Sequence, residues 1–246
     1  MKLLITGASG FLGKYVAAEA LRRGHAVRAM VRPGAEPAKR GWADEARDGR
    51  LELARVDLRS RKGLVEAVEG VDAVIHLAAA KVGDVYGQYA GSVIATENLL
   101  WAMEQAPGKS PRLVHISTFS VYDLMKPRAW SVIDEESQVE RDALERDGYA
   151  HTKLVQERIV REAAGKNGWE LVVIRPGMIY GRDNLWNAFC GLEAGSRLWL
   201  RTGTFAKLAL TYVENVAEAI VMAAEVKGAA GQTLNVVDDD LPSRRA

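Results

Sequence analysis

Short apolar runs alternate with helix-patterned segments along this chain, and this alternation is the feature that most constrains its fold. The runs are apolar throughout, which is typical of strands buried on both faces of a parallel sheet. We predict strands at Leu3–Ile5, Ala26–Val31, Leu51–Val56, Asp72–Leu77, Arg112–Ser117, Glu170–Arg175 and in the segment TLNVV. We predict helices at Phe11–Arg23, Lys62–Glu69, Tyr89–Gln105, Tyr149–Ala164 and Glu214–Val226. The pattern predicts an α/β fold, a doubly wound parallel sheet that binds ligands beyond the carboxyl ends of its strands.

The composition is that of a soluble globular enzyme. The chain is 48% apolar and 26% charged with a net charge of +1, so no strong field attracts nucleic acid or acidic membranes. Cys190 is the only cysteine, which excludes an intramolecular disulfide and fits a reducing compartment. No apolar segment is long enough to span a bilayer, and no His/Cys/Asp spacing indicates a metal site. We expect a cytoplasmic homodimer that binds a small-molecule substrate, and neither nucleic acid nor a membrane.

Three glycines, Gly7, Gly10 and Gly13, recur at every third residue where the first predicted strand meets the first predicted helix. In this setting the first glycine makes the turn, the second admits a pyrophosphate, and the third lets the helix pack on the strand. The helix N-terminus adds free N–H groups and a favourable dipole. The stretch predicts a dinucleotide site, and a tight turn without a ligand is the alternative.

Two Tyr-x-x-x-Lys pairs occur in the chain. Tyr149 and Lys153 open a well-patterned helix, where residues four apart share a face, so the ammonium should lower the pKa of the phenol and make it a usable general acid or base. Tyr122 and Lys126 have the same spacing, but Pro127 follows them, and the residue before a proline avoids helical conformation. We therefore predict that only the first pair carries proton chemistry.

The second predicted strand ends in Val31-Arg32, and no carboxylate follows until Glu36. NAD-specific sites place Asp or Glu near this position to hold the ribose 2′-hydroxyl, whereas an arginine can pair with a 2′-phosphate. We predict NADP as the preferred cofactor, with NAD as the alternative. A merely solvated Arg32 is the other interpretation.

The stretch TGASGFLG, together with Tyr149 and Lys153, resembles the extended short-chain dehydrogenase/reductase superfamily, which includes nucleotide-sugar epimerases and dehydratases. The resemblance covers nearly the whole chain. It implies that Thr118, within the stretch STFSVY, is a catalytic hydroxyl acting with Tyr149 and Lys153, with Ser117 as the fallback. The alternative is that these hydroxyls only cap a strand end.

The resemblance also implies a cofactor-binding surface made by several segments. The stretch HLAAA would pack against the cofactor, an acidic residue would lie near the adenine, and RPGMIYG would line the nicotinamide. With Arg32 added, the expected cofactor-binding residues are Gly7, Ser9, Gly10, Phe11, Leu12, Gly13, Arg32, Asp57, Leu58, Leu77, Ala78, Ala79, Tyr149, Lys153, Pro176, Gly177, Met178 and Ile179. His76 and His115 lie within apolar strands, where we expect buried structural histidines.

The chain departs from the superfamily at two places. Ser92 and Ala95 stand where the superfamily often has Asn and Gly in Asn-Val-x-Gly-Thr, which puts a proton relay through that asparagine in doubt. The chain also ends at DDDLPSRRA, where relatives usually continue with further helices. We predict a Rossmann domain over residues 1–180 and a small substrate lobe over residues 181–246, part of which returns to the Rossmann core. A truncated lobe and a naturally short one are both open.

Three functions fit these patterns. The first is an NAD(P)-dependent oxidoreductase, the second a nucleotide-sugar epimerase or dehydratase, and the third a dinucleotide-sensing protein without chemistry. The intact Thr118, Tyr149 and Lys153 argue against the third. The apolar residues before Tyr212, and TYVENVAEA itself, look closer to hydroxysteroid dehydrogenase and flavonoid reductase relatives than to sugar-nucleotide enzymes. We expect a largely apolar substrate that lies beside the aromatic residues Trp186, Phe189, Trp199 and Phe205. The basic residues of the same segment argue against this expectation, because they could bind phosphates: Arg182, Arg197, Arg201 and Lys207.

Overall fold

The computed structural model describes residues 1–34, 49–108, 110–123, 131–144, 146–182, 184 and 207–241, and the backbone alone of residues 192–194 and 198–200. Within this part of the chain, seven strands form one parallel sheet in the order β11-β6-β5-β4-β1-β2-β3. The strands are β1 (Lys2–Thr6), β2 (Ala26–Val31), β3 (Leu51–Arg55), β4 (Ala73–His76), β5 (Arg112–Ile116), β6 (Leu171–Pro176) and β11 (Thr233–Val236). The strand order reverses between β1 and β4, so the doubly wound sheet is confirmed, and its ligand-binding edge lies beyond the carboxyl ends of these strands.

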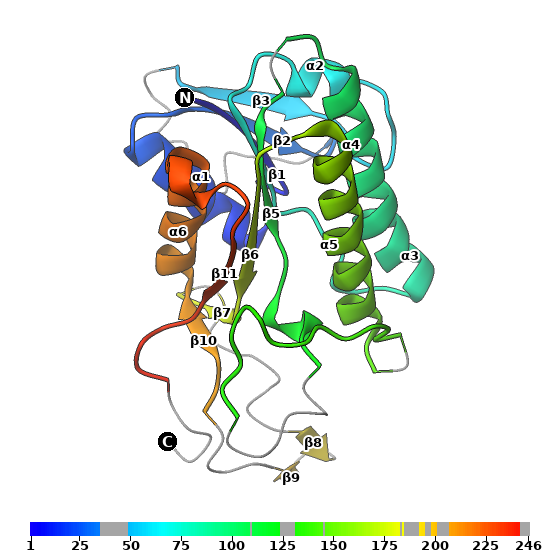
Figure 1. Cartoon of the computed structure of the whole chain (residues 1–246), viewed down its shortest axis with the longest axis vertical. Helices are drawn as coiled ribbons and strands as arrows, with labels where there is room; N and C mark the ends of the chain where they lie inside the picture. The colour runs from blue at the N-terminus through cyan, green and yellow to red at the C-terminus, as the bar shows by residue number, and fades with distance from the viewer. Residues whose placement is uncertain are drawn as a thin grey trace.

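Helices cover both faces of the sheet (Figure 1). On one face lie α1 (Phe11–Arg22) and α6 (Val213–Glu225), and on the other lie α2 (Leu64–Val68), α4 (Ala95–Gln105) and α5 (Gly148–Asn167). The helix predicted to begin at Tyr89 begins four residues earlier, as α3 (Val85–Tyr89), and runs through a π-helical turn, Ala90–Ile94, into α4. The other predicted elements agree with the structure to within a few residues.

Alternate residues of the strands face two different cores. Leu3 and Ile5 on β1 pack with α1 and α6, whereas Leu4 packs with α2 and α4. This alternation follows from the two-residue period of a strand. β3 is one of the two edge strands of this sheet, and its side chains are only half-buried or exposed.

Two buried arginines tie helix ends to the edge of the sheet opposite the ligand-binding edge. Arg28 on β2 donates from Nη1 to three carbonyls at the end of α2, at 2.8–3.2 Å. Arg112 on β5 does the same at the end of α6, at 2.7–3.2 Å. The last carbonyls of a helix lack partners within the helix and carry its negative dipole, so a guanidinium there stabilises the helix end.

The segment after residue 181 contributes to two regions. α6 and β11 belong to the layers of the main sheet, with β11 paired to β6. Two short pairs lie apart from that sheet: β7 (Met178–Tyr180) with β10 (Leu210–Tyr212), and β8 (Leu192–Ala194) with β9 (Leu198–Leu200). The boundary at residue 180 stays a prediction. None of the described helices is long and apolar enough to cross a membrane.

Candidate active site

The turn after β1 is shaped by glycines. Gly7 has a φ of +66°, a conformation that L side chains rarely adopt, and a Cβ there would lie 3.0 Å from the Ala78 nitrogen. A Cβ at Gly13 would collide with the Gly7 carbonyl oxygen. Gly10 is the exposed N-cap of α1, where a Cβ would meet the Gly7 oxygen at 3.2 Å and no other described atom within 4 Å. The turn therefore fits a dinucleotide phosphate at an open helix N-terminus.

A buried polar network holds the carboxyl ends of β1 and β4 together. The Thr6 hydroxyl contacts His76 Nδ1 at 2.8 Å and accepts from the backbone N–H groups of Leu77 and Ala78, at 3.2 and 3.3 Å. His76 Nε2 contacts the Thr96 hydroxyl on α4, at 2.8 Å. Burial lowers the pKa of His76 to about 3, so the ring is neutral. This network fixes the strand end that was predicted to pack against the cofactor.

The π-helical turn between α3 and α4 contains Ser92, which stands where the superfamily often has asparagine. Its hydroxyl accepts from the Ala80 N–H at 3.0 Å, just beyond the strand end. Gln156 on α5 donates to the Ser92 carbonyl at 3.1 Å and to the Thr96 hydroxyl at 2.7 Å. The short Ser92 side chain thus holds the backbone of the segment that follows β4.

The far end of the predicted cofactor surface is lined by β2 and β3. Arg32 is exposed after β2, and Asp57 follows β3 and accepts from Arg59 Nη2 at 2.6 Å and from Arg59 Nε at 3.1 Å. The Arg59 hydrogen bond is the main reason that the pKa of Asp57 is lowered, and the charge of Arg32 adds to it. The side chain of Leu58 packs into the core on the α2 and α4 side, and its carbonyl accepts from Asn98 Nδ2 at 2.9 Å. Glu36 lies outside the described residues.

Thr118, Tyr149 and Lys153 meet at the carboxyl end of β5. Asp147 caps α5 by accepting from the Tyr149 N–H at 3.0 Å, which fixes the first turn of the helix. The Thr118 hydroxyl lies close enough to the Tyr149 phenol to lower its pKa. Lys153 lies one turn further along and donates from Nζ to the Ile116 carbonyl of β5, at 2.5 Å. The predicted trio is therefore one cluster.

The protonation of this cluster differs from the expectation. Burial raises the pKa of Tyr149 to about 12, and the Thr118 hydrogen bond only partly opposes this. Burial also lowers the pKa of Lys153 to about 7. The expected lowering of the phenol pKa by the ammonium is therefore wrong for this structure, because desolvation disfavours the charged form of each group.

The alternatives to Thr118 and Tyr149 are engaged elsewhere. The Ser117 hydroxyl donates to Glu157 Oε2 at 2.6 Å. Tyr122 is 1% exposed, and its hydroxyl donates to Asn235 at 2.9 Å and accepts from Arg175 Nη1 at 2.9 Å. Lys126 and Pro127 lie outside the described residues. Thr118 also caps a short 3₁₀ turn by accepting from the Ser120 N–H at 3.2 Å, so it performs the capping role as well.

The segment after β6 is held against β10. A Cβ at Gly177 would collide with the Ala209 carbonyl oxygen, which leaves no room for a side chain. The Tyr180 hydroxyl at the end of β7 donates to Asp238 at 3.0 Å, and Asp238 also accepts from the Tyr212 N–H at 3.1 Å. These contacts fix the stretch Pro176–Ile179 that was predicted to line the nicotinamide.

Two charged residues near Lys153 were not predicted. Glu157 follows Lys153 by one helical turn, so its spacing on the face of α5 was a usable signal. Lys81 directly follows HLAAA, and its Nζ lies 5.8 Å from the centroid of the Tyr149 ring. Only the fold brings Lys81 to the tyrosine, so the sequence held no signal for it.

The predicted substrate lobe is largely outside the described residues. This applies to Trp186, Phe189, Cys190, Arg197, Arg201, Phe205 and the side chain of Trp199. Arg182 and Lys207 are exposed, and Lys207 donates to the Leu241 carbonyl at 2.7 Å. Within the described residues, no group of three or more His, Cys, Asp or Glu side chains could hold a metal ion.

A sequence profile of the NAD dependent epimerase/dehydratase family matches residues 3–236. The chain belongs to this family. Membership confirms the resemblance to the extended short-chain dehydrogenase/reductase superfamily and supports an NAD(P)-dependent oxidoreductase, epimerase or dehydratase activity.

Individual relatives in this family are reductases and dehydrogenases. The chain is 31% identical to 4-hydroxy-2-methyl-3-oxo-4-farnesyl-3,4-dihydroquinoline-1-oxide ketoreductase of Stigmatella aurantiaca, over 97% of the chain and 68% of that protein. It is 31% identical to cinnamoyl-CoA reductase 1 of Petunia hybrida, over 72% of the chain and 54% of that protein. It is 29% identical to 3-beta-hydroxysteroid dehydrogenase of Mycolicibacterium neoaurum, over 91% of the chain and 61% of that protein. The chain thus spans only about half to two thirds of the length of these relatives.

Solved structures of other proteins share the fold. The terminal R domain of the myxalamid PKS-NRPS pathway superposes with a TM-score of 0.77 at 26% identity, covering 98% of this chain and 67% of that one. UDP-glucuronic acid 4-epimerase from Bacillus cereus, in complex with UDP-glucuronic acid and NAD, superposes with a TM-score of 0.76 at 24% identity. The superposition covers 99% of this chain and 79% of that one.

Proposed function

We propose that this chain is an NAD(P)-dependent oxidoreductase that interconverts an alcohol and a carbonyl on a small, largely apolar substrate. The observation that carries the proposal is the cluster of Thr118, Tyr149 and Lys153 beyond β5, at the same edge of the sheet as the glycine turn. A general acid or base beside a dinucleotide site is what hydride chemistry at a carbonyl requires.

The protonation of the cluster favours reduction at neutral pH. When bound, the nicotinamide supplies or accepts the hydride. Tyr149 carries its proton at neutral pH because its pKa is about 12, so it is set to donate that proton to a carbonyl oxygen. The Thr118 hydroxyl beside the phenol can donate its one hydrogen bond to the substrate oxygen, and a charged Lys153 would stabilise the phenolate left behind.

The apolar substrate is supported by two observations. The residues before Tyr212, Leu208-Ala209-Leu210-Thr211, offer no cation for a diphosphate. The relatives named above include a ketoreductase of a farnesylated quinoline and a hydroxysteroid dehydrogenase, whose named substrates are mostly hydrocarbon. The aromatic residues of the proposed lobe, 181–246, would line such a pocket.

A substrate panel with nicotinamide absorbance as the readout tests the function. Apolar ketones, aldehydes and steroid alcohols should give net cofactor turnover, whereas UDP-sugars and dTDP-sugars should not. Conversion of a sugar nucleotide without net turnover of cofactor would establish the second candidate, an epimerase or dehydratase. Cofactor binding without any conversion would support the third candidate, a sensing protein.

We also propose that the site prefers NADP over NAD. Arg32 is exposed at the end of β2, and the neighbouring carboxylate of Asp57 is already paired with Arg59. A 2′-phosphate would therefore meet the cation of Arg32, and the Asp57 carboxylate beside it is already paired.

Titration of both cofactors by calorimetry checks this preference. Arg32→Ala should weaken NADP(H) binding about tenfold or more and leave NAD(H) binding nearly unchanged, because a hydrogen bond to a charged group contributes about 1.5–3 kcal/mol. Arg158→Ala removes an exposed cation from α5 and serves as the charge-matched control. Tighter binding of NAD(H) than NADP(H) to the wild type would refute the preference.

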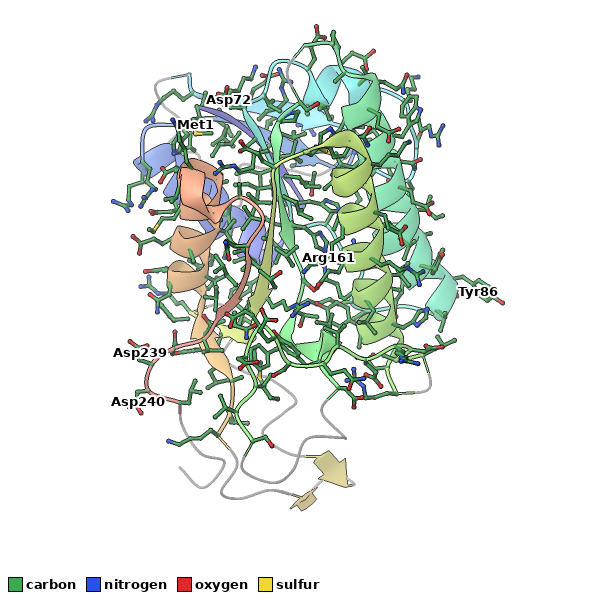
Figure 2. The ribbon with its side chains drawn as sticks, in the orientation of Figure 1. Met1, Asp72, Tyr86, Arg161, Asp239 and Asp240 are labelled. Atoms are coloured by element: carbon green, nitrogen blue, oxygen red, sulfur yellow. The ribbon has the colours of Figure 1, made fainter. Side chains whose placement is uncertain are left out.

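A homodimer is part of the proposal as well. Val85 and Tyr86 on α3 are 51% and 86% exposed, and Figure 2 shows Tyr86 pointing away from the helix. Exposed apolar side chains of this size suit a contact with a second copy. Light scattering should give twice the chain mass of 26.9 kDa, and the monomer mass at working concentrations would refute it.

A further inference from the structure

Building on the proposed function, we propose that Glu157 is a positioning residue of the active site. Its carboxylate lies one helical turn from Lys153 on the buried face of α5, where it favours the charged lysine, and it fixes the strand ends that carry Thr118 and Pro176. Neither Glu157 nor Lys81 contacts a reacting atom in this assignment. They act through Lys153 and through the backbone.

Glu157 is a buried carboxylate with all its partners in place. Its side chain is 8% exposed. Oε2 accepts from the Ser117 hydroxyl at 2.6 Å and from Arg175 Nε at 3.2 Å. Oε1 accepts from Arg175 Nη2 at 2.5 Å and from Arg161 Nη2 at 2.8 Å. A buried charge held by this many donors stays ionised, and the pKa of Glu157 is accordingly lowered despite its burial.

These contacts tie α5 to three strand ends. Ser117 directly precedes Thr118, and Arg175 directly precedes Pro176. Arg175 continues through the Tyr122 hydroxyl to β11, and Arg161 reaches the Thr233 hydroxyl of β11 at 2.8 Å. Arg161 is labelled in Figure 2 between α5 and the sheet. One carboxylate therefore sets the position of the segments on either side of the reacting centre.

Lys153 lies between charges of opposite sign. The titratable groups that influence it or are influenced by it are His76 on β4, His115 on β5, Lys81 after β4 and Glu157 on α5. Burial keeps both histidines neutral, and Tyr149 keeps its proton at neutral pH. Glu157 raises the pKa of Lys153 and Lys81 lowers it, which leaves it at about 7 after the larger effect of burial.

Direct titration of the lysine separates this role from a purely structural one. The protein is labelled with ¹³Cε-lysine, and the Lys153 signal is identified by its loss in Lys153→Arg. Its titration is followed by NMR without cofactor or substrate, so the result does not depend on whether the proposed function is correct. Four proteins are compared: the wild type, Glu157→Gln, Lys81→Met and the control Glu162→Gln, which removes an exposed carboxylate from the same helix.

The expected shifts have opposite signs. Glu157→Gln should move the titration of Lys153 to lower pH by about one pH unit, because removal of a close opposite charge disfavours the ammonium. Lys81→Met should move it to higher pH, and Glu162→Gln should leave it in place. In the loaded enzyme, the fall of kcat with rising pH should begin at lower pH in Glu157→Gln, while Glu157→Asp restores the wild-type profile.

Two results would overturn the assignment. The first is a folded Glu157→Gln variant, judged by circular dichroism, in which Lys153 titrates as in the wild type. The second is an unchanged or lowered titration in Lys81→Met, which tests the same electrostatics if Glu157→Gln does not fold. A wild type without reductase activity would disprove the proposed function and leave the NMR result standing.

Discussion

The two faces of the central sheet are covered by different kinds of side chain. The face covered by α1 and α6 is filled with aliphatic side chains and alanines. The face covered by α4 and α5 combines such a core with a buried polar network that includes His76, Thr96, Lys153, Gln156 and Glu157. Buried polar groups destabilise the folded state unless every one is paired. Their concentration on one face therefore indicates that this face supports the candidate active site. The aliphatic core between α1 and α6 contributes to stability through packing.

Loss of the phenol on the polar face should have the largest effect. Tyr149→Phe should lower kcat by about 10²- to 10⁴-fold, the usual contribution of a general acid or base, and leave cofactor affinity within a fewfold of the wild type. Tyr122→Phe should lower kcat less, because its hydroxyl binds Asn235 and Arg175 in the supporting network and takes no part in proton transfer. Steady-state kinetics and calorimetry measure both, and equal losses of kcat from the two variants would contradict the assignment.

A truncation on the aliphatic face should change stability without changing chemistry. Ile220 on α6 is fully buried in the core with α1. Ile220→Ala should lower the free energy of unfolding by about 2–5 kcal/mol through the cavity it leaves, with kcat unchanged at a temperature where the variant is folded. Urea unfolding and kinetics on one preparation provide the comparison. A large loss of kcat in the folded variant would show that the two faces are not independent.

The smallest effect should be a pH dependence of stability that arises on the polar face. His115 is fully buried on β5, and neither ring nitrogen has a hydrogen-bond partner among the described residues. Burial lowers its pKa well below 6.5, so below pH 6.5 the unfolded state binds a proton that the folded state does not. Stability is therefore greatest above that pH and falls as the pH drops through it.

Replacing this histidine should weaken the acid sensitivity. In His115→Leu, the difference in the free energy of unfolding between pH 7 and pH 5 should be smaller than in the wild type. Urea unfolding at the two pH values measures it. An equal difference in both proteins would mean that His115 does not contribute to the acid sensitivity.

The elements were predictable because their signals are local. Apolar runs, the glycine turn, and Tyr149 with Lys153 four residues apart on a helix can all be read within one segment, and the strands and the sheet type are confirmed. The protonation of Tyr149 was not predictable, because its burial depends on how α5 packs on the sheet. Lys81 was not predicted for the same reason, since the loop after β4 brings it to Tyr149 on α5, nearly seventy residues later in the chain. The π-helical turn at Ala90–Ile94 also left no local signal.

The way α6 covers α1 has a consequence for how the protein is made. Synthesis proceeds from the N-terminus at about 5–20 residues per second, and the partners of β1 and α1 on the aliphatic face include Val216, Ile220 and Val221. That face therefore stays open on the ribosome for about 10–40 seconds after α1 has emerged. During this time the nascent chain exposes the apolar side chains of α1 that α6 later covers.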